Sequence, residues 1–284
     1  MSHIQCDQVK ARGRPEAATS GTNLDSRPDQ SRRGLPQRDI SLTFAKGMTV
    51  LKAFDAANTH LTLPQIARIT GLDRATTRRL VLTLAHLGYV QQKDRVFSLT
   101  PRILVLAGGF LQGRQFGKTI QPVMRAFAQH IGEPISMAMV DGYEAVYVAH
   151  SGGDASTISI GFTIGSRLPL LHTSIGRALA AFSDPVTADD IIRNAPLQKF
   201  TAMTVEDRVA ISEDIAATRE KGYAFVDGEF ETGVAAIAVP VRATGQEIAA
   251  LGVSASSARF KSHDFRKIVL STLNDCSAAI SGLI

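Results

Sequence analysis

Residues 61–90 read LTLPQIARITGLDRATTRRLVLTLAHLGYV, and this stretch carries the strongest structural signal in the chain. It begins as a short helix with Pro64 in its first turn, where a missing amide proton is harmless. Gly71 ends that helix, and Asp73 is a good N-cap for a second helix that reaches about Gly88. Two helices joined by a glycine-containing turn predict a helix-turn-helix.

The second helix has two chemically different faces. With Thr76 at zero on a helical wheel, an apolar group falls within about 90°; its members are Leu80, Thr83, Leu84 and Leu87. The opposite face carries Arg74 and Arg78 beside Val81 and Ala85, with Thr77 at its edge. Arginine pairs bidentately with guanine, and threonine touches a thymine methyl group or a phosphate. We therefore expect this face in the DNA major groove, with Arg79, nearer to the core side, on a backbone phosphate.

A small hairpin follows the second helix. Residues 89–90 and 96–97 alternate around a polar tip, so Lys93 and Arg95 are expected on a wing that contacts phosphate or the minor groove. The candidate DNA-binding residues are Arg74, Ala75, Thr77, Arg78, Arg79, Lys93 and Arg95. The competing interpretation is a solvated helix face, which charged residues occupy by default.

The charge of the 284-residue chain is concentrated around this motif. Residues 41–115 hold ten Lys or Arg against three Asp or Glu, whereas residues 116–284 hold 14 against 18. A basic segment joined to a mildly acidic remainder is typical of a polyanion-binding module attached to a separate domain. A merely well-solvated surface is the alternative.

Composition and pattern divide the chain into four parts. Residues 1–40 lack an apolar period and predict a disordered tail, residues 41–102 a winged helix-turn-helix domain, residues 103–117 a linker helix, and residues 118–284 a second domain. The second domain shows helical stretches at 119–131, 174–183, 206–221 and 263–283. Strand-like stretches are 135–140, 145–150, 157–162, 223–227, 234–241 and 248–254. This order favours an antiparallel sheet flanked by helices, so the fold class is α+β with two domains.

Several classes of protein are disfavoured. The two cysteines lie at opposite ends of the chain, which excludes a disulfide framework and a cysteine-based zinc site. No apolar run reaches the roughly 20 residues of a membrane helix, and the N-terminus has no secretory signal, so a cytoplasmic location is expected. The seven histidines are never closer than 20 residues apart, and no phosphate loop or nucleophile elbow is present. We expect neither an enzyme nor a cofactor.

These segments resemble the IclR family of transcriptional regulators. The DNA-binding domain of that family is similar to residues 41–115, and its effector-binding domain is similar to IGSRLPLLHTSIGRALAAF (164–182), REKGYAFVDGEFETGVAAIAVPV (219–241) and AALGVSASSARF (249–260). The start AKGMTVLKAFD and the helix ATTRRLVLTLAHLGYV most resemble the branch that controls protocatechuate and 4-hydroxybenzoate catabolism in the β-ketoadipate pathway.

The resemblance implies that the second domain is GAF-like and binds a small organic acid. Carried over position by position, it places Ser174, Ile175, Asp227, Ala236, Gly252 and Ser254 in the effector site. Arg167 and His172 are further candidates to line the mouth or neutralise the acid. Thr173 or Ser174 caps a helix whose free backbone N–H groups suit a carboxylate. Alanine at 236 and glycine at 252 replace the cysteine and serine that glyoxylate- or pyruvate-responsive relatives carry, which favours a larger, less polar acid.

Each effector candidate has a structural alternative. Ser174 could be a helix cap only, Arg167 an ion-pair partner, His172 a structural histidine, and Asp227 a residue that fixes the following turn. The partners expected are double-stranded operator DNA, a small carboxylate, a second copy of the chain in a dimer or dimer of dimers, and RNA polymerase if the protein is an activator. The alternative function is a small-molecule sensor or enzyme whose basic module binds a protein partner instead of DNA.

Overall fold

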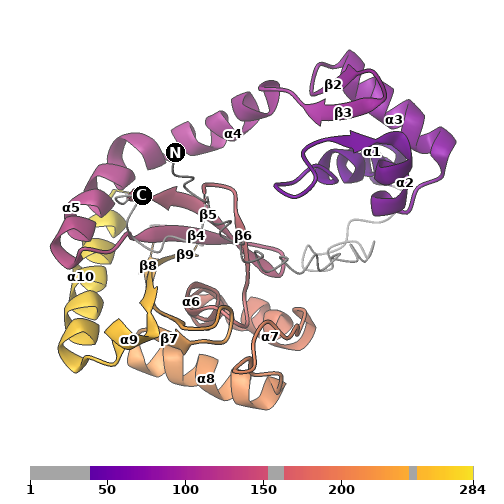
Figure 1. Cartoon of the computed structure of the whole chain (residues 1–284). Helices are drawn as coiled ribbons and strands as arrows, with labels where there is room; N and C mark the ends of the chain where they lie inside the picture. Colours follow the sequence, from indigo (N-terminus) through magenta and orange to yellow (C-terminus); the bar gives the residue numbers. More distant parts are fainter. Residues whose placement is uncertain (1–38, 153–162, 243–247, 284) are drawn as a thin grey trace, which may run out of the picture. The chain divides into compact units, whose positions relative to one another are not determined.

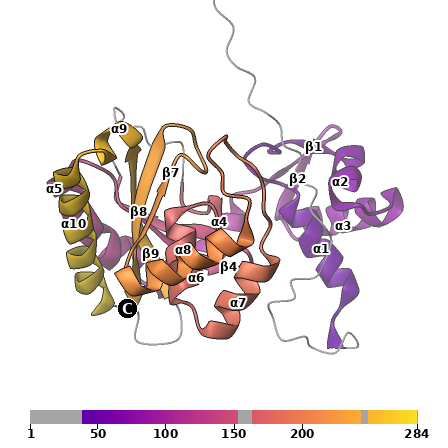
Figure 2. The same ribbon diagram turned by 90° about the horizontal axis from the view of Figure 1, so that it is seen from below.

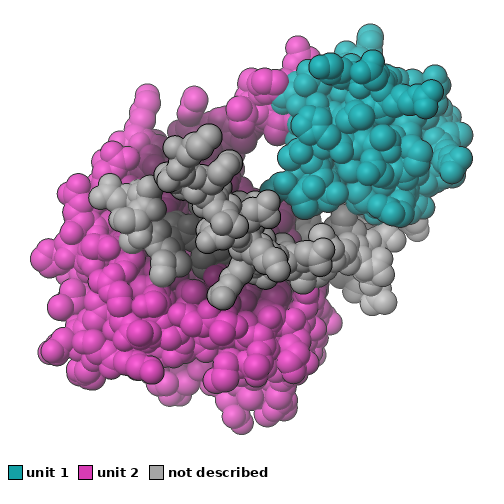
Figure 3. All heavy atoms as spheres, viewed as in Figure 1, with its two compact units in different colours: residues 1–28, 36–100 teal, residues 29–35, 101–284 magenta. Residues whose placement is uncertain are grey.

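The computed structural model describes residues 39–152, 163–242 and 248–283. The predicted tail falls almost entirely outside these residues, as does the whole strand expected over 157–162. In the described part, the chain divides into two compact units between Thr100 and Pro101, which Figure 3 colours separately. None of the helices in the described ranges is long and apolar enough to cross a membrane.

The first unit is a winged helix-turn-helix, as predicted (Figure 1). Its helices are α1 (Leu42–Lys52), α2 (Leu63–Thr70) and α3 (Arg74–His86), and its strands are β1 (Leu61–Thr62), β2 (Val90–Lys93) and β3 (Val96–Leu99). The sheet is antiparallel in the order β1-β3-β2; the two-residue strand β1 was not expected from the sequence. Gly71, at φ 67°, ends α2 in the left-handed conformation that glycine adopts without strain. The backbone N–H of Thr76 donates to Asp73 Oδ1 at 2.8 Å, which starts α3.

The second unit is the predicted α+β domain, built on a six-stranded antiparallel sheet in the order β6-β5-β4-β9-β8-β7. Its strands are β4 (Ser136–Asp141), β5 (Glu144–His150), β6 (Arg167–Pro169), β7 (Ala224–Asp227), β8 (Val234–Arg242) and β9 (Ile248–Ser256). Its helices are α4 (Arg102–Gly113), η2 (Phe116–Ile120), α5 (Gln121–Ile131), α6 (Ser174–Phe182), α7 (Pro185–Asn194), α8 (Arg208–Lys221), α9 (Ser257–Phe260) and α10 (His263–Ser281). Of these, β6, α7 and the short α9 were not expected.

Helices cover both faces of this sheet (Figure 2). Helices α5 and α10 pack on one face over a core that includes Met124, Leu251 and Leu273. Helices α6, α7 and α8 lie on the other face, where Leu179, Ile191 and Ile211 are buried. The second face holds the cavity described below.

The expected linker helix over 103–117 is two elements. Helix α4 ends at Gly113, and Gln115 has a φ of 55°, which is uncommon outside glycine. The chain then continues as a π-helical turn, η2, directly into α5. Phe116 and Ile120 of η2 are buried in the core of the second unit, so η2 is fixed to the sheet that α5 covers.

Candidate functional site

Helix α3 presents a basic stripe to solvent. The exposed residues lie three or four positions apart, so they share one side of the helix. They are Ala75, Arg78, Arg79 and Leu82. Arg74 is also exposed at the first position of the helix. Among the described residues, Arg74, Arg78 and Arg79 form no ion pair. Their guanidinium groups are therefore available to an external anion.

The sequence-based division of α3 into faces was wrong for several residues. Thr77 is 0% exposed and Val81 is also buried, whereas Thr83 and Leu87, expected in the core, are exposed. Arg79 lies on the solvent side. The physical reason is that α3 packs against both α1 and α2, so the core takes the set Thr77, Leu80, Val81 and Leu84. Within this structure the Thr77 hydroxyl reaches neither solvent nor a hydrogen-bond partner in the described residues.

The wing is a tight hairpin with an exposed basic tip. Lys93 and Arg95 are exposed on either side of Asp94, which has a φ of 56°. The Gln92 side chain donates to the backbone carbonyl of Asp94 at 2.7 Å and braces the turn. The structure therefore brings the two predicted wing cations together at one tip.

The second unit contains a cavity of about 70 Å³ between the sheet and the start of α6. A single water molecule needs roughly 10–15 Å³ of such space, so the cavity can hold more than one water. The floor comes from neighbouring strands and the roof from the residues that lead into α6. The described lining residues are Ser136, Tyr147, Leu168, His172, Thr173, Ser174, Ile175, Val226, Phe230, Glu231, Val234, Ala236, Gly252, Val253 and Ser254.

The roof of the cavity is a helix N-terminus with unpaired amides. Thr173 is the N-cap: its Oγ1 accepts the Gly176 N–H at 3.1 Å and donates to the Pro169 carbonyl at 2.8 Å. The N–H groups of Ser174 and Ile175 have no partner in the described residues. Ser174 is therefore not the cap, and these two donors, reinforced by the helix dipole, form a site for a carboxylate.

Two close contacts fix α6 over the sheet. A Cβ on Gly176 would lie 2.2 Å from the carbonyl oxygen of Leu170, so only glycine lets the helix approach that backbone. A Cβ on Gly252 would lie 2.5 Å from Cγ1 of Ile175, which seats on the sheet there. Both glycines therefore set the height of the roof.

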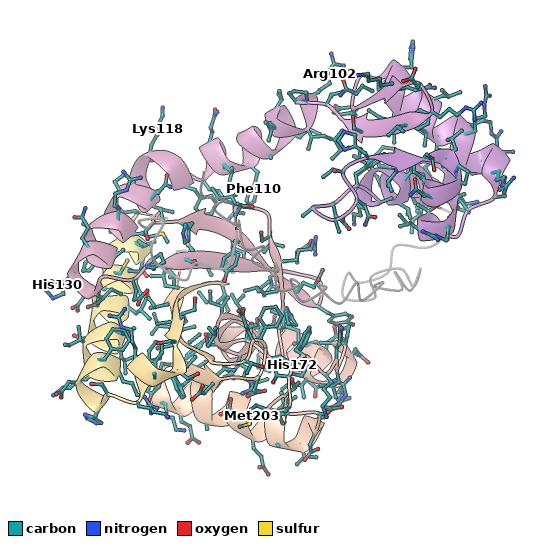
Figure 4. All side chains as sticks on the ribbon, in the orientation of Figure 1. Arg102, Phe110, Lys118, His130, His172 and Met203 are labelled. Carbon is teal, nitrogen blue, oxygen red and sulfur yellow. The ribbon has the colours of Figure 1, made fainter. Side chains whose placement is uncertain are left out.

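His172 is buried beside the cavity with both ring nitrogens unpaired among the described residues (0% exposed). In Figure 4 it lies in the interior of the second unit, whereas His130 on α5 points outward. Its ring packs edge-on against Phe200 at 5.4 Å between centroids. Burial and, secondarily, the charge of Arg177 lower the pKa of His172 to about 4. The imidazole is therefore neutral at pH 7 and offers one donor and one acceptor.

Two of the predicted effector residues lie elsewhere. Arg167, on β6, pairs with Asp141 and with Glu144 across the adjoining strands, so its charge is already compensated. Asp227 is exposed at the end of β7 and accepts a hydrogen bond from Ser257 at 2.5 Å. Neither lines the cavity. The structure brings the other six together: His172, Ser174, Ile175, Ala236, Gly252 and Ser254.

Ser136, Tyr147, Phe230 and Glu231 line the cavity and were missed from the sequence. The hydroxyl of Tyr147 hydrogen-bonds to Ser136, and Ser136 Oγ lies 3.0 Å from His150 Nδ1. Burial raises the pKa of Tyr147 to about 12 and that of Glu231 above its ordinary value. Only strand register brings Ser136 next to Gly252 and His150, so no local pattern could have identified it.

A buried arginine holds the walls of the cavity. Arg177 donates to Glu229 at 2.7 Å, to Asp214 at 3.0 Å and to the carbonyl of Leu171 at 2.9 Å. These contacts tie the segment before α6 to the loop that carries Phe230 and Glu231. Since two carboxylates compensate the charge of Arg177 and it is not among the described lining residues, it positions the walls of the cavity without lining it.

Comparison with known proteins identifies both units. Residues 43–94 match the IclR helix-turn-helix domain, and residues 109–282 match the bacterial transcriptional regulator IclR C-terminal domain. The chain is 35% identical over 217 residues to the Pca regulon regulatory protein of Pseudomonas putida, covering 76% of this chain and 75% of that protein. It is 31% identical over 251 residues to the p-hydroxybenzoate hydroxylase transcriptional activator of Acinetobacter baylyi, covering 87% and 93%.

A solved structure shows the same fold. An IclR homologue from Microbacterium hydrocarbonoxydans, complexed with 4-hydroxybenzoate, superimposes with a TM-score of 0.71 at 24% identity, over 85% of this chain and 98% of that one. The relatives are regulators rather than enzymes, and they support the protocatechuate and 4-hydroxybenzoate branch. The chain belongs to the IclR family of bacterial transcriptional regulators.

Proposed function

We propose that the winged helix-turn-helix binds a double-stranded operator, and that an aromatic acid in the cavity controls operator binding or promoter activation. Arg74, Arg78 and Arg79 on α3 supply the guanidinium groups, and the wing tip at Lys93 and Arg95 supplies phosphate contacts. Ala75, exposed on the same stripe, is small enough for the helix to approach base edges closely.

The observation that carries the effector proposal is the roof of the cavity. Among the described residues, the N–H groups of Ser174 and Ile175 and the ring nitrogens of the buried His172 have no partner, and no Lys or Arg lines the cavity that these residues share. A single carboxylate satisfies such donors without a counter-cation. Ala236, Gly252, Val226 and Val234 leave an apolar remainder that suits a ring.

The relatives favour an aromatic ligand. One is named as the p-hydroxybenzoate hydroxylase transcriptional activator, and the Microbacterium homologue was crystallised with 4-hydroxybenzoate. Arg167 and Asp227 contribute to the proposal only indirectly, through the strand ends that they hold.

We also propose that a second copy of the chain covers exposed apolar side chains of α4. Leu104, Val105 and Leu106 are 59–73% exposed, and Phe110 is exposed on the same helix. Large apolar side chains exposed in such number on one helix are typical of an interaction surface. Helix α1 likewise exposes Phe44. Sedimentation equilibrium of Leu104→Glu should show a larger monomer fraction than wild type; an unchanged mass would contradict this assignment.

The test of the main proposal is a mobility-shift titration on the DNA upstream of the gene, with aromatic and dicarboxylic acids, at two salt concentrations. Specific binding should weaken steeply with salt, and one acid should change it. Ala236→Leu fills the cavity and should remove the response to acid while leaving operator affinity unchanged. Ala126→Leu, on the exposed side of α5, is the matched control. Absence of both a specific shift and heparin retention would refute DNA binding.

A further inference from the structure

The strands of the cavity floor carry hydroxyl groups on β4, β5 and β9 but none on β7 or β8. Ser136 on β4 and Tyr147 on β5 lie on one side of β9, whereas Val226 on β7 and Val234 and Ala236 on β8 lie on the other. The side of β7 and β8 also carries Phe230 and Glu231, in the loop between these two strands. Beyond Thr173 and Ser174 at the roof and Ser254 on β9 itself, a ligand anchored under α6 therefore meets hydroxyl groups only if it extends toward β4 and β5.

The distance from the roof to this polar side suits a substituted ring. Ile175 seats on Gly252, and Ser136 is the register partner of Gly252 in the neighbouring strand. Adjacent strands are roughly 4.8 Å apart, so Ser136 and Tyr147 lie about one and two strand spacings from the floor beneath Ile175. A benzene ring with substituents at both ends has a length of this order.

Hydrogen-bond capacity leaves room for a ligand on Ser136. A hydroxyl group donates once and accepts twice. Ser136 Oγ lies 3.0 Å from His150 Nδ1 and bonds to the hydroxyl of Tyr147, which occupies two of these three positions. Because neutral imidazole can either donate or accept at Nδ1, the chain from His150 to Tyr147 adjusts to a ligand that donates or accepts.

This polar side carries no charge. Burial lowers the pKa of His150 and raises that of Tyr147 to about 12, so both are neutral at pH 7. The lining residues described include no cation, and the Glu231 carboxyl lies on the opposite side. A second carboxylate placed here would be buried without compensation, which is far more costly than a buried hydroxyl.

We propose that Ser136, positioned by Tyr147 and His150, binds a hydroxyl group of the effector and thereby selects a hydroxylated monocarboxylic acid over a dicarboxylate. The inference rests on the proposed function, because it assigns a role within the same cavity. It adds residues that the sequence comparison did not indicate. It also assigns the carboxylate to α6 and the hydroxyl to β4, and so fixes the orientation of the ligand.

Calorimetry with three probes on the full-length protein tests this assignment: 4-hydroxybenzoate, benzoate and adipate. Wild type should bind 4-hydroxybenzoate about 5- to 150-fold more tightly than benzoate, which corresponds to leaving one buried hydrogen bond unmade. Ser136→Ala should reduce this ratio to about one without changing benzoate affinity, and Tyr147→Phe should reduce it partly. Tyr143→Phe, outside the cavity and bonded to Asp190, is the matched control.

The outcomes separate the two proposals. If wild type binds none of these acids, or if Ala236→Leu binds them as wild type does, the cavity is not the effector site and both proposals fail. If wild type binds benzoate as tightly as 4-hydroxybenzoate, or adipate more tightly, the role of Ser136 is refuted while the effector site stands. Should Ser136→Ala unfold, Tyr147→Phe decides, because an unchanged ratio in that variant overturns the proposal.

Discussion

Replacing Gly176 with alanine tests whether α6 is seated on the segment before it. The added Cβ would lie 2.2 Å from the Leu170 carbonyl oxygen and 2.4 Å from its Cα. These are backbone atoms of a buried segment, so no side-chain rotation can relieve the clash. Helix α6 or the segment that carries His172 must move instead.

The size of that movement follows from the contact distances. Ordinary contact begins at 3.4 Å, so the clash with Leu170 requires a displacement of about 1.2 Å. Overpacking in a core costs about 1–3 kcal/mol and sometimes more, and a rigid backbone partner puts Gly176→Ala at the upper end. For a unit of this size, each kcal/mol lowers the melting temperature by about 2–4 °C, so the expected loss is about 6–12 °C.

Calorimetric melting and acid binding of Gly176→Ala measure both consequences. The roof amides of Ser174 and Ile175 move with the helix, so affinity for the acid should fall together with the melting temperature. Gly109→Ala is the control, because nothing lies within 4 Å of its added Cβ on α4. Alanine is a better helix former than glycine by about 1 kcal/mol, so this variant should be unchanged or more stable. A Gly176→Ala protein that melts within about 2 °C of wild type and binds the acid normally would refute the packing argument.

Three further variants address the remaining assignments. Thr77→Val should stabilise the first unit by about 1–2 kcal/mol in urea unfolding, because it removes a buried hydroxyl that lacks a partner, and should leave operator affinity intact; weaker DNA binding would return Thr77 to the interface. Arg78→Ala should weaken specific operator binding by about 1–3 kcal/mol, whereas the control Arg193→Ala on α7 should not weaken it. If Arg78→Ala lost the same binding free energy on random DNA, Arg78 would contact a phosphate and not a base. In wild type, the unfolded His172 has a pKa near 6.5 and the folded one a pKa of about 4, so the unfolded state binds a proton first as the pH falls. The free energy of unfolding therefore decreases by at most roughly 3 kcal/mol between these two pKa values. His172→Gln should remove this decrease. An identical pH profile in His172→Gln would show that another group causes the loss.

Local patterns were sufficient where local interactions decide the structure. Gly71 and Asp73 mark the turn between α2 and α3 because left-handed backbone and N-capping depend on one or two residues. The buried and exposed faces of α3 were predicted less accurately, because contact with α1 and α2 decides which residues of α3 are buried. The spacing of Thr77, Leu80, Val81 and Leu84 carries this signal, but Thr77 made the set look polar.

The candidate site shows where sequence information ends. The amides of α6 were predicted because a capping residue and a glycine identify a helix start. The ion pairs of Arg167 could not be foreseen, because its two partners, Asp141 and Glu144, approach it only through pairing of β4, β5 and β6. Ser136 was missed for the same reason, since its neighbours Gly252 and His150 are more than 100 and 14 residues away along the chain.

His150 gives the cavity a physical connection to the element that leads toward the DNA-binding unit. Its Nδ1 contacts Ser136 at the cavity, and its backbone carbonyl accepts a 2.8 Å hydrogen bond from the side chain of Gln121, the first residue of α5. Helix α5 follows η2, which is packed on the same core and follows α4. A ligand that bonds to Ser136 therefore acts on the strand end to which this helix start is tied. Such coupling can shift operator affinity only by the difference in ligand affinity between two arrangements, typically about 5- to 150-fold, and the operator must change ligand affinity by the same factor. Gln121→Leu removes that hydrogen bond. In this variant, the factor by which operator DNA changes acid affinity and the factor by which the acid changes operator affinity should both approach one, because a coupling that depends on this contact is lost in both directions.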